Sequence, residues 1–420
     1  MISTGANAIA PRSGTFVDNM KLPVHRWFRY SAGFSAQWAS SVIKGFDEGI
    51  TVLDPFAGSG TAVLEGGKAG AKAIGLESHP FIGRIAQAKV LWDIDVKSLY
   101  QLGEELSSHA RRHLCASPPD ESPLLASCYS PEYLTQLHSL VQSWRSADTD
   151  EAVSRLAWLA VVSIARSSSY VGTAQWQYVL PKKRKKTVLE PFAAFTAKII
   201  QMASDIKALR EFSGRPPGEI RVEDARYCTS VETDSVDLVI TSPPYANNFD
   251  YADATRLEMT LLGEIRGWSD LQVHVRDHLV RSCTQHVGSA KSVLPDILEQ
   301  PELDSIRPEL ARIYNELERE RMRHGGKKNY HTMLAHYMYD MSLVWRSLRR
   351  VVRPGGQVCF VIGDSAPYGV HAPIDKWFGI LAKDAGFESY VFAKQRDRNT
   401  KWKNRKHTVP LHEGLLWVQG

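Results

Sequence analysis

Short apolar runs alternate with amphipathic stretches in three parts of the chain. Four-to-seven-residue runs of Val, Ile, Leu and Phe end at turn residues, and segments with helical periodicity follow several of them. This succession of strand and helix with short turns is typical of a mostly parallel α/β sheet. Strands are predicted at 51–56, 72–77, 219–224, 235–241, 357–363, 389–394 and 414–418, and helices at 61–69, 80–92 and 343–352, the last followed by a tight Pro-Gly-Gly turn at 354–356.

Two polar and mostly helical stretches interrupt this pattern. They predict insertions into a single α/β domain rather than separate α/β units, because the strand pattern resumes after each of them. The chain therefore divides into an N-terminal arm with the first half of the α/β domain (1–95), a helical insertion (96–214), a short second half (215–251), a second helical insertion (252–332) and a C-terminal part (333–420).

Composition excludes several classes of protein. No apolar stretch reaches the roughly 18 residues that a membrane span needs, and the first residues do not have the pattern of a secretory signal. The five cysteines are odd in number and form no C-x-x-C pair, so we expect neither a disulfide framework nor a metal site. These features favour a protein of the reducing cytoplasm.

A glycine-rich turn, DPFAGSGT, joins the first predicted strand to a helix. Its glycines allow the backbone to approach a ligand closely, although a plain strand-to-helix turn is the alternative. Glu77 ends the next strand 19 residues after Gly58, where an acidic residue in nucleotide-binding folds holds ribose hydroxyls, and Asp224 follows the third strand, within reach of an adenine. The predicted cofactor residues are Asp54, Pro55, Phe56, Gly58, Ser59, Gly60, Thr61, Glu77 and Asp224.

Asp54, at the end of the first predicted strand, indicates which adenosyl ligand the site binds. A dinucleotide would bring its pyrophosphate towards Asp54, and the two negative charges would repel each other. A cationic ligand suits an acidic tip better, and the amino and sulfonium groups of S-adenosylmethionine provide such charges. S-adenosylmethionine is therefore the predicted cofactor.

The tetrad Ser242-Pro243-Pro244-Tyr245 follows the apolar strand at 235–241 and is the predicted catalytic motif. An exocyclic amine of a base is a poor nucleophile, because its lone pair is delocalised into the ring. The Ser242 hydroxyl and the Pro243 carbonyl would accept its two N–H groups, while Tyr245 would stack on an extruded base. A polyproline turn is the alternative, as in Ser-Pro-Pro-Asp at 117–120, which follows no strand and has no aromatic residue.

These two motifs together resemble those of the DNA amino-methyltransferases. The serine at the head of SPPY is most similar to the cytosine-N4 group, because adenine-N6 members more often carry Asp or Asn there. The resemblance implies a Rossmann-like methyltransferase fold with a reversed final hairpin, and a target base flipped out of the duplex. It covers 25–95, 215–251 and 333–420 and leaves out both insertions, each of which is a candidate for target recognition.

Basic residues cluster most densely at 394–406, between the last two predicted strands. This segment has seven Lys or Arg and one acid, a local charge of +6 against +5 for the whole chain. A solvated loop is the alternative to phosphate contacts here. Asn247, Asn248 and Asp250, directly after the tetrad, either bind the flipped base or order the next loop. The predicted nucleic-acid contacts are Arg396, Arg398, Lys401, Lys403, Arg405 and Lys406.

The sequence thus predicts a DNA methyltransferase acting on N4 of a flipped cytosine in double-stranded DNA, located at the nucleoid. Adenine N6 in DNA or an amino group in RNA is the alternative target on the same scaffold. A binding protein without activity would be expected to have lost part of a motif, and both are intact; a small-molecule substrate would not explain the basic hairpin. A cognate restriction endonuclease is a candidate partner, and the oligomeric state stays open.

Overall fold

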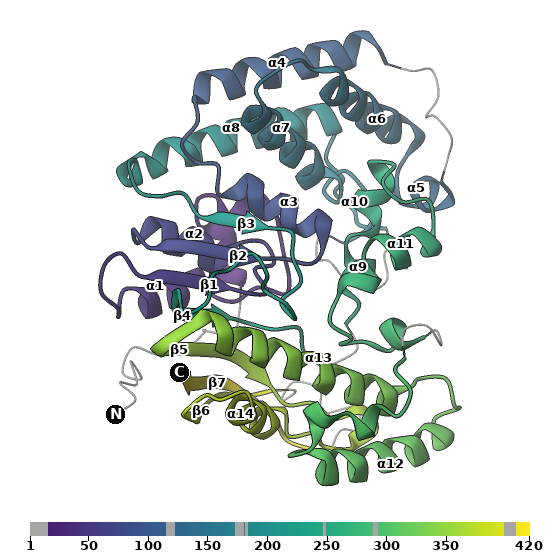
Figure 1. Ribbon diagram of the computed structural model, residues 1–420. Coiled ribbons are helices and arrows are strands. Elements are labelled where there is room, and N and C mark those ends of the chain that lie inside the picture. Colours follow the sequence, from purple (N-terminus) through teal and green to yellow (C-terminus); the bar gives the residue numbers. More distant parts are fainter. Residues whose placement is uncertain are drawn as a thin grey trace.

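The computed structural model of the protein describes residues 16–114, 122–172, 180, 184–246, 249–288, 293–398 and 409–420. One seven-stranded sheet with the order β3-β2-β1-β4-β5-β7-β6 lies at its centre (Figure 1). Neighbouring strands from β3 to β5 are parallel, and β7 is antiparallel to both β5 and β6. The strands are β1 (Thr51–Asp54), β2 (Lys72–Leu76), β3 (Glu219–Arg221), β4 (Val236–Thr241), β5 (Val352–Gly363), β6 (Ser389–Arg398) and β7 (Leu411–Gln419).

This arrangement confirms the predicted α/β methyltransferase fold, with a mostly parallel sheet and a reversed final hairpin. Helices cover both faces, as a parallel sheet requires. On one face lie α1 (Ala36–Ile43), α2 (Thr61–Lys68) and α3 (Pro80–Lys89), and on the other lie α13 (Tyr330–Val351) and α14 (Ile374–Asp384) (Figure 1).

Alternation along the central strands explains the two cores. Leu238 and Ile240 of β4 pack with α1, while Val239 between them packs with α13 and α14 on the opposite face. Since successive side chains of a strand point to opposite faces, a strand that is apolar at every position must be covered twice. All six residues of β4 are buried accordingly.

The first insertion forms a helical lobe above α3 (Figure 1). Its apolar residues share one buried cluster with Phe81 and Ile85 of α3, which fixes the lobe to the sheet domain. Asp205 of the lobe accepts hydrogen bonds from Val24 N, Arg26 Nε and Trp27 Nε1, each at 3.0 Å, and so ties the N-terminal arm to the lobe. The lobe helices are α4 (Val96–Arg112), α5 (Pro123–Cys128), α6 (Pro131–Ser146), α7 (Glu151–Ile164) and α8 (Pro191–Ala208).

The first helices of the second insertion lie beside the sheet, between the helical lobe and α13, and its last helix, α12, lies below α13 (Figure 1). A buried ion pair between Arg166 of the lobe and Glu258, with Nε 2.6 Å from Oε1, joins the two insertions. Its helices are α9 (Tyr251–Ala254), α10 (Arg256–Leu261), α11 (Trp268–His274) and α12 (Arg307–Arg323). Short 3₁₀ helices are η1 (Val17–Lys21), η2 (His25–Trp27), η3 (Leu209–Phe212), η4 (Arg276–His278), η5 (Thr284–Val287), η7 (Ile297–Glu299), η8 (Pro301–Leu303) and η9 (Pro367–Gly369).

The largest differences from the predicted boundaries lie at α13 and β5. Helix α13 begins at Tyr330, well before the predicted start, and β5 follows it at once. The Pro-Gly-Gly segment, predicted as a tight turn between helix and strand, lies within β5 as an irregularity, where the pairing jumps from Val236–Val352 to Leu238–Gln357. Gly355 has a φ of +79°, and its N–H donates to the carbonyl of Gly420, so pairing with the end of the last strand keeps this segment in the sheet.

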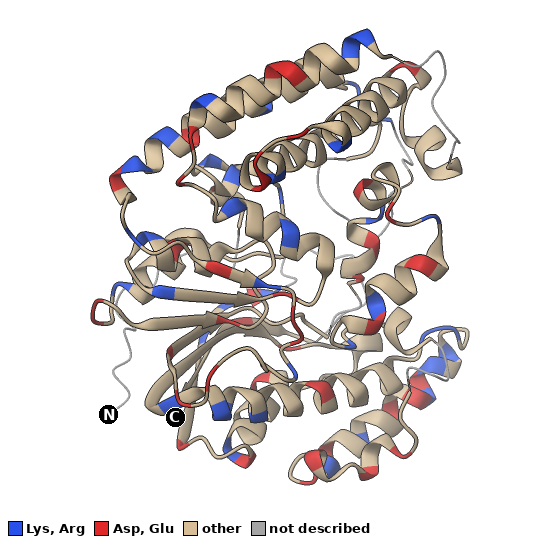
Figure 2. Ribbon diagram, turned by 45° about the horizontal axis from the view of Figure 1, so that its top comes forward, with Lys and Arg blue, Asp and Glu red and all other residues tan. Residues whose placement is uncertain are grey.

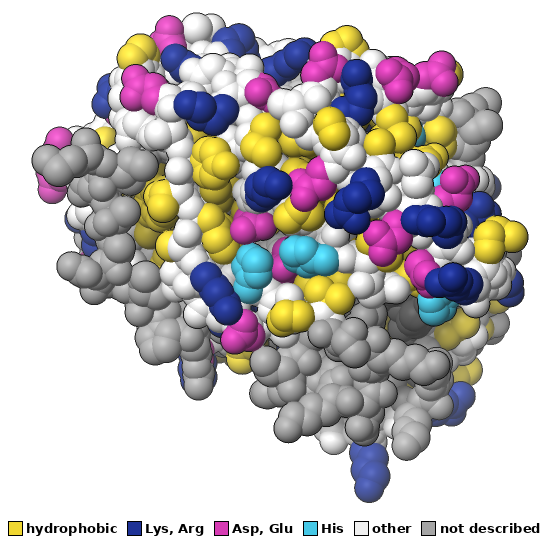
Figure 3. Space-filling view, turned by 90° about the horizontal axis from the view of Figure 1, so that it is seen from below, with side chains coloured by type: hydrophobic (Ala, Val, Ile, Leu, Met, Phe, Trp, Pro, Cys, Tyr) yellow, Lys and Arg dark blue, Asp and Glu magenta, His cyan; other side chains and the backbone are white. Residues whose placement is uncertain are grey.

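Charged residues are mixed rather than segregated on the described surface. Lys and Arg alternate with Asp and Glu along the helices above and below the sheet (Figure 2). Seen from below, the described side chains of both signs are interspersed with hydrophobic ones and form no patch of a single charge (Figure 3). Within the described ranges, every helix is too short or too polar to cross a membrane.

Candidate active site

A cavity of about 540 Å³, open to solvent on one side, lies beyond the carboxyl ends of the strands. The strand order reverses between β1 and β4, and ligands of doubly wound sheets bind at such a switch point. The residues that line the cavity from the strand ends are Phe56 and Gly58 after β1, Glu77 after β2, and Ser242 and Pro244 after β4. The two predicted motifs therefore meet in one cavity.

The glycine-rich turn holds its shape through backbone conformations that favour glycine. Gly58 has a φ of +52° and Gly60 a φ of +82°, both in the left-handed region. A Cβ atom on Gly58 would also lie 2.8 Å from Cε1 of Tyr30, whose ring packs against the turn. Space and conformation both require glycine at this position.

Glu77 joins the turn to the next strand. Its Oε2 accepts from Gly58 N at 2.7 Å and its Oε1 accepts from His79 N at 2.8 Å. Burial raises the pKa of Glu77 to about 7, and the two backbone hydrogen bonds oppose that shift. Each carboxylate oxygen keeps a further lone pair, so Glu77 has the acceptors that a pair of ribose hydroxyls needs.

Asp54 is fully buried at the end of β1 and does not line the cavity. Its Oδ1 accepts from Thr241 Oγ1 at 2.5 Å and from Phe56 N at 3.1 Å, whereas Oδ2 has no hydrogen-bond partner within the described part of the chain. Burial raises the pKa of Asp54 to about 7 against these hydrogen bonds. A buried carboxylate with an unpaired oxygen is stabilised by a cationic ligand nearby, and S-adenosylmethionine is such a ligand.

The remaining predicted cofactor residues are distributed around this turn. Ser59 and Thr61 line a smaller cavity of about 200 Å³ together with Lys89, whose Nζ lies 3.4 Å from Ser59 Oγ. Asp224 is outside the lining of both cavities, and Arg226 contacts both of its carboxylate oxygens, with Nε 3.0 Å from Oδ1 and 2.9 Å from Oδ2. The contact of Asp224 with an adenine therefore stays a prediction.

The catalytic tetrad is anchored to neighbouring elements by its polar atoms. Ser242 Oγ donates to the carbonyl of Val361 at 3.2 Å, which leaves its lone pairs as acceptors. The carbonyl of Pro244 accepts from Tyr337 Oη of α13 at 2.8 Å. Pro243 is buried and does not line the cavity, so its predicted role as second acceptor stays a prediction.

Tyr245 is placed behind the cavity wall rather than in its lining. Its hydroxyl lies 3.4 Å from both the Val361 carbonyl and Glu413 Oε2, and the guanidinium of Arg398 stands 5.1 Å from the ring centre. Burial raises the pKa of Tyr245, so the phenol is neutral. Arg398 is one of the predicted DNA contacts, and the predicted stacking of a base on Tyr245 stays a prediction.

The other predicted DNA contacts are only partly described. Arg396 of β6 pairs with the buried Glu413, with Nη2 2.8 Å from Oε1. Lys401, Lys403, Arg405 and Lys406 lie outside the described residues, as do Asn247 and Asn248. Asp250 is described, and it orders the following loop: it caps α9 by accepting from the N–H groups of Ala252 and Asp253.

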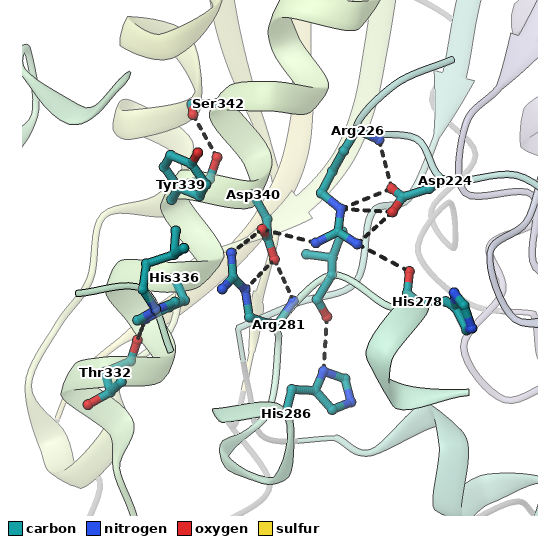
Figure 4. Close-up of polar contacts among 12 residues, drawn as sticks. Asp224, Arg226, His278, Arg281, His286, Thr332, His336, Tyr339, Asp340 and Ser342 are labelled. Atoms are coloured by element: carbon teal, nitrogen blue, oxygen red, sulfur yellow. Dashed lines mark hydrogen bonds and ion pairs between the residues drawn. The ribbon is translucent and has the colours of Figure 1, made fainter. Parts of the chain in front are cut away.

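One wall of the cavity was missed by the sequence analysis. Leu279, Val280 and Ser282 of the second insertion line it opposite the strand ends. Arg281 between them pairs with Asp340 of α13, with Nη2 2.6 Å from Oδ1, and Arg226 pairs with the same carboxylate at 3.2 Å (Figure 4). These contacts join segments that are far apart in the chain, so no local sequence motif predicts them. Tyr30, Ala32, Ser78, His79 and Tyr251 complete the lining.

The sheet, the turn at Gly58 and the acceptors of Glu77 are consistent with the fold and cofactor site of an S-adenosylmethionine-dependent methyltransferase. Comparison with known proteins agrees. The chain is 25% identical to the type II methyltransferase M.BsoBI of Geobacillus stearothermophilus, over 95% of this chain and 86% of that protein. It is 26% identical to the type II methyltransferase M.AvaI of Nostoc sp. and of Anabaena variabilis, over 89% of this chain and 81% of each relative.

No protein-family model matches the chain. The similarity to the type II methyltransferases nevertheless extends through both insertions, because it covers most of the chain. It confirms the predicted resemblance to DNA methyltransferases and the predicted cofactor, S-adenosylmethionine.

Proposed function

We propose that this protein is a site-specific DNA methyltransferase that transfers a methyl group to the exocyclic N4 of a flipped cytosine, as the modification enzyme of a restriction-modification system. The observation that carries the proposal is the shared cavity, in which Gly58 and Glu77 lie on one wall and Ser242 and Pro244 on another. The type II methyltransferases that resemble the chain support DNA as the substrate.

The cofactor side provides affinity and orientation. Glu77 would hold the ribose through its remaining lone pairs, while the turn at Gly58 allows the backbone to lie against the ligand. Asp54 would contribute negative charge near the cationic end of the cofactor. When bound, S-adenosylmethionine supplies an activated methyl group, so the chain needs no covalent nucleophile.

The base side orients the amine. Because the Ser242 hydroxyl donates to Val361, its oxygen is set to accept one N–H of the target amine. The Pro243 carbonyl would accept the other, and two acceptors together direct the nitrogen lone pair towards the methyl group. Positive charge develops on the amine during transfer, and fixed acceptor dipoles stabilise it without reorganising.

The choice of cytosine rests on the serine at position 242. A hydroxyl accepts from an amine and also donates, as it does to Val361 at 3.2 Å, whereas a carboxylate in its place would only accept. Target recognition falls to the insertions, because the sheet domain alone provides the cofactor turn and the tetrad. Arg396, Arg398 and the basic residues at 401–406 would contact phosphates.

The test uses purified full-length protein, methyl-labelled S-adenosylmethionine and mixed-sequence unmethylated DNA. After digestion to nucleosides, labelled N4-methylcytosine identified by mass would support the proposal. Labelled N6-methyladenine would overturn the choice of base and keep DNA as substrate. Label found in RNA and not in DNA would overturn the substrate class. The same assay with Ser117→Ala, in the second Ser-Pro-Pro segment of the chain, is the matched control and should leave the product unchanged.

A further inference from the structure

Three metal-ligating side chains meet next to the cavity without a role in the proposed reaction. Asp250, Cys283 and His286 are all buried, and one potential ligand atom from each lies within 4.8 Å of the other two. They come from two separate segments, since Asp250 follows the catalytic tetrad and the other two belong to the second insertion. Ser282, the neighbour of Cys283, lines the cavity.

The local structure explains why Cys283 and His286 face the same way. Cys283 is the residue before the 3₁₀ helix η5, and the N–H of His286 donates to its carbonyl at 3.1 Å. A 3₁₀ helix has three residues per turn, so side chains at i and i+3 eclipse each other. The segment Cys-x-x-His therefore presents a thiol and an imidazole side by side.

The imidazole of His286 has an unused nitrogen directed at this cluster. Its Nδ1 lies 3.0 Å from the carbonyl of Val280 and must donate its proton there, because a carbonyl only accepts (Figure 4). In the neutral ring Nε2 then has a lone pair. This nitrogen is buried, lies 3.7 Å from Asp250 Oδ1 and has no hydrogen-bond partner within the described residues.

Asp250 is held in place by its own partners. Its Oδ2 accepts from Arg276 Nη2 at 2.5 Å and from Nε at 3.1 Å, so Oδ1 turns towards His286. Oδ1 also accepts from Ala252 N at 3.1 Å. Outer partners of this kind, a carbonyl for the imidazole and an arginine for the carboxylate, are typical of residues that ligate metals.

We infer that Asp250, Cys283 and His286 form a binding site for a zinc ion. Thiolate, imidazole and carboxylate are the ligands that zinc prefers, and the negative charges of thiolate and carboxylate balance its charge in a buried place. Three protein ligands leave a fourth position for water. The absence of paired cysteines predicted no metal site, whereas this cluster combines one cysteine with one histidine and one aspartate.

The site would join the two sides of the cavity. Asp250 caps α9 directly after the tetrad, while Cys283 and His286 belong to the segment that forms the opposite wall. A zinc ion between them would fix the distance from Ser242 to Ser282. Its role is to position this wall, and the inference does not depend on which base is methylated.

The first experiment measures metal content. Full-length untagged protein is incubated with zinc chloride, freed of excess by gel filtration and analysed by inductively coupled plasma mass spectrometry. We expect about one zinc per chain, retained in Cys128→Ala and lost in Cys283→Ala. Cys128 is the matched control because it is also buried but lies in the helical lobe. Equal zinc in the two variants, or none in the unaltered protein, would overturn the inference.

The second experiment avoids variants that fail to fold. The unaltered protein is stripped with a chelator and titrated with cobalt chloride. A thiolate-to-cobalt charge-transfer band together with intense visible bands of tetrahedral cobalt is the expected result. A spectrum of hydrated cobalt at every addition would overturn the inference and leave a Cys–His–Asp cluster that binds no metal. Neither experiment measures methyl transfer, so a failure here is distinguishable from a failure of the proposed function.

Discussion

The two sides of the cavity are built in different ways. The cofactor side comes from two consecutive strand ends, and its central contact, Gly58 N to Glu77, spans 19 residues and involves the backbone. The opposite wall, at Leu279 to Ser282, is held by side chains over long separations, as in the pair of Arg281 with Asp340, 59 residues apart. A short motif that acts through its backbone can be recognised in the local sequence. A wall that is held by ion pairs between distant segments cannot be recognised in this way, because its position depends on residues elsewhere in the chain. The comparison shows that the cofactor side depends on local backbone contacts and the opposite wall on contacts between distant segments.

The largest expected effect separates binding of the cofactor from reaction of the base. Ser242→Ala removes an acceptor fixed by Val361, so turnover should fall on the order of 10²–10³-fold, as when one fixed partner of a developing charge is lost. The dissociation constant of the cofactor should stay within about twofold. Single-turnover methylation and calorimetry measure the two quantities. A parallel loss of cofactor affinity, with the fold intact by circular dichroism, would contradict the separation of the two sides.

Disrupting the opposite wall should cost stability first. Asp340 is fully buried and bonded to two arginines, so Asp340→Asn removes the buried negative charge that Arg226 and Arg281 share. We expect the free energy of unfolding to fall by about 3–5 kcal/mol, the usual loss when one partner of a buried ion pair is removed. Urea denaturation measures it.

The matched control for this variant is an exposed ion pair. Asp304→Asn removes a carboxylate that is 65% exposed and pairs with Arg307, and such pairs contribute about 0–1 kcal/mol. A loss for Asp340→Asn no larger than that of the control would show that the wall does not depend on this ion pair. If Asp340→Asn also raises the Michaelis constant for DNA while cofactor affinity is unchanged, the two sides of the cavity differ in function as well as in construction.

The same difference explains what the sequence could predict. The fold and the cofactor turn follow from contiguous patterns, and both motifs indeed meet in one cavity. The wall at Leu279 to Ser282 has no such pattern, because its position depends on Asp340 and Arg226, which are brought there by α13 and by the loop after β3. The local sequence also gave a wrong prediction where long-range pairing determines the structure. The segment at Gly355 has the sequence of a turn, but it lies inside β5 because the N–H of Gly355 donates to the carbonyl of Gly420.

Substituting Glu77 should affect cofactor binding with little effect on the base side. Glu77→Gln keeps the shape but replaces a charged acceptor by a neutral amide. Hydrogen bonds to charged groups contribute about 1.5–3 kcal/mol, so the dissociation constant of S-adenosylhomocysteine should rise roughly 10- to 100-fold. Calorimetry measures it directly. An unchanged dissociation constant would mean that Glu77 does not bind the ribose. A loss of DNA affinity of the same size would mean that the cofactor side does not act independently of the base side.

The last expected effect is a pH dependence that has opposite signs with and without cofactor. Burial raises the pKa values of Asp54 and Glu77 to about 7, above their usual range in the unfolded chain. Between about pH 4 and 7 the folded, ligand-free protein thus binds more protons than the unfolded chain. The contribution of these two groups to stability is therefore full below pH 4 and lost as the pH rises through 7.

Cofactor binding should show the reverse trend, because a cationic ligand needs both carboxylates ionised. S-adenosylmethionine should bind more tightly at pH 8 than at pH 6, by up to about tenfold for each carboxyl group that has a pKa of about 7 and must be ionised. S-adenosylhomocysteine, which lacks the sulfonium charge, should show a weaker trend. Calorimetry at both pH values with Glu77→Gln as a control separates the two carboxyl groups: the variant should retain only the part due to Asp54. An affinity for S-adenosylmethionine that is flat across this range would mean that both groups are already ionised without ligand, and that the acidic cofactor side acts through shape rather than charge.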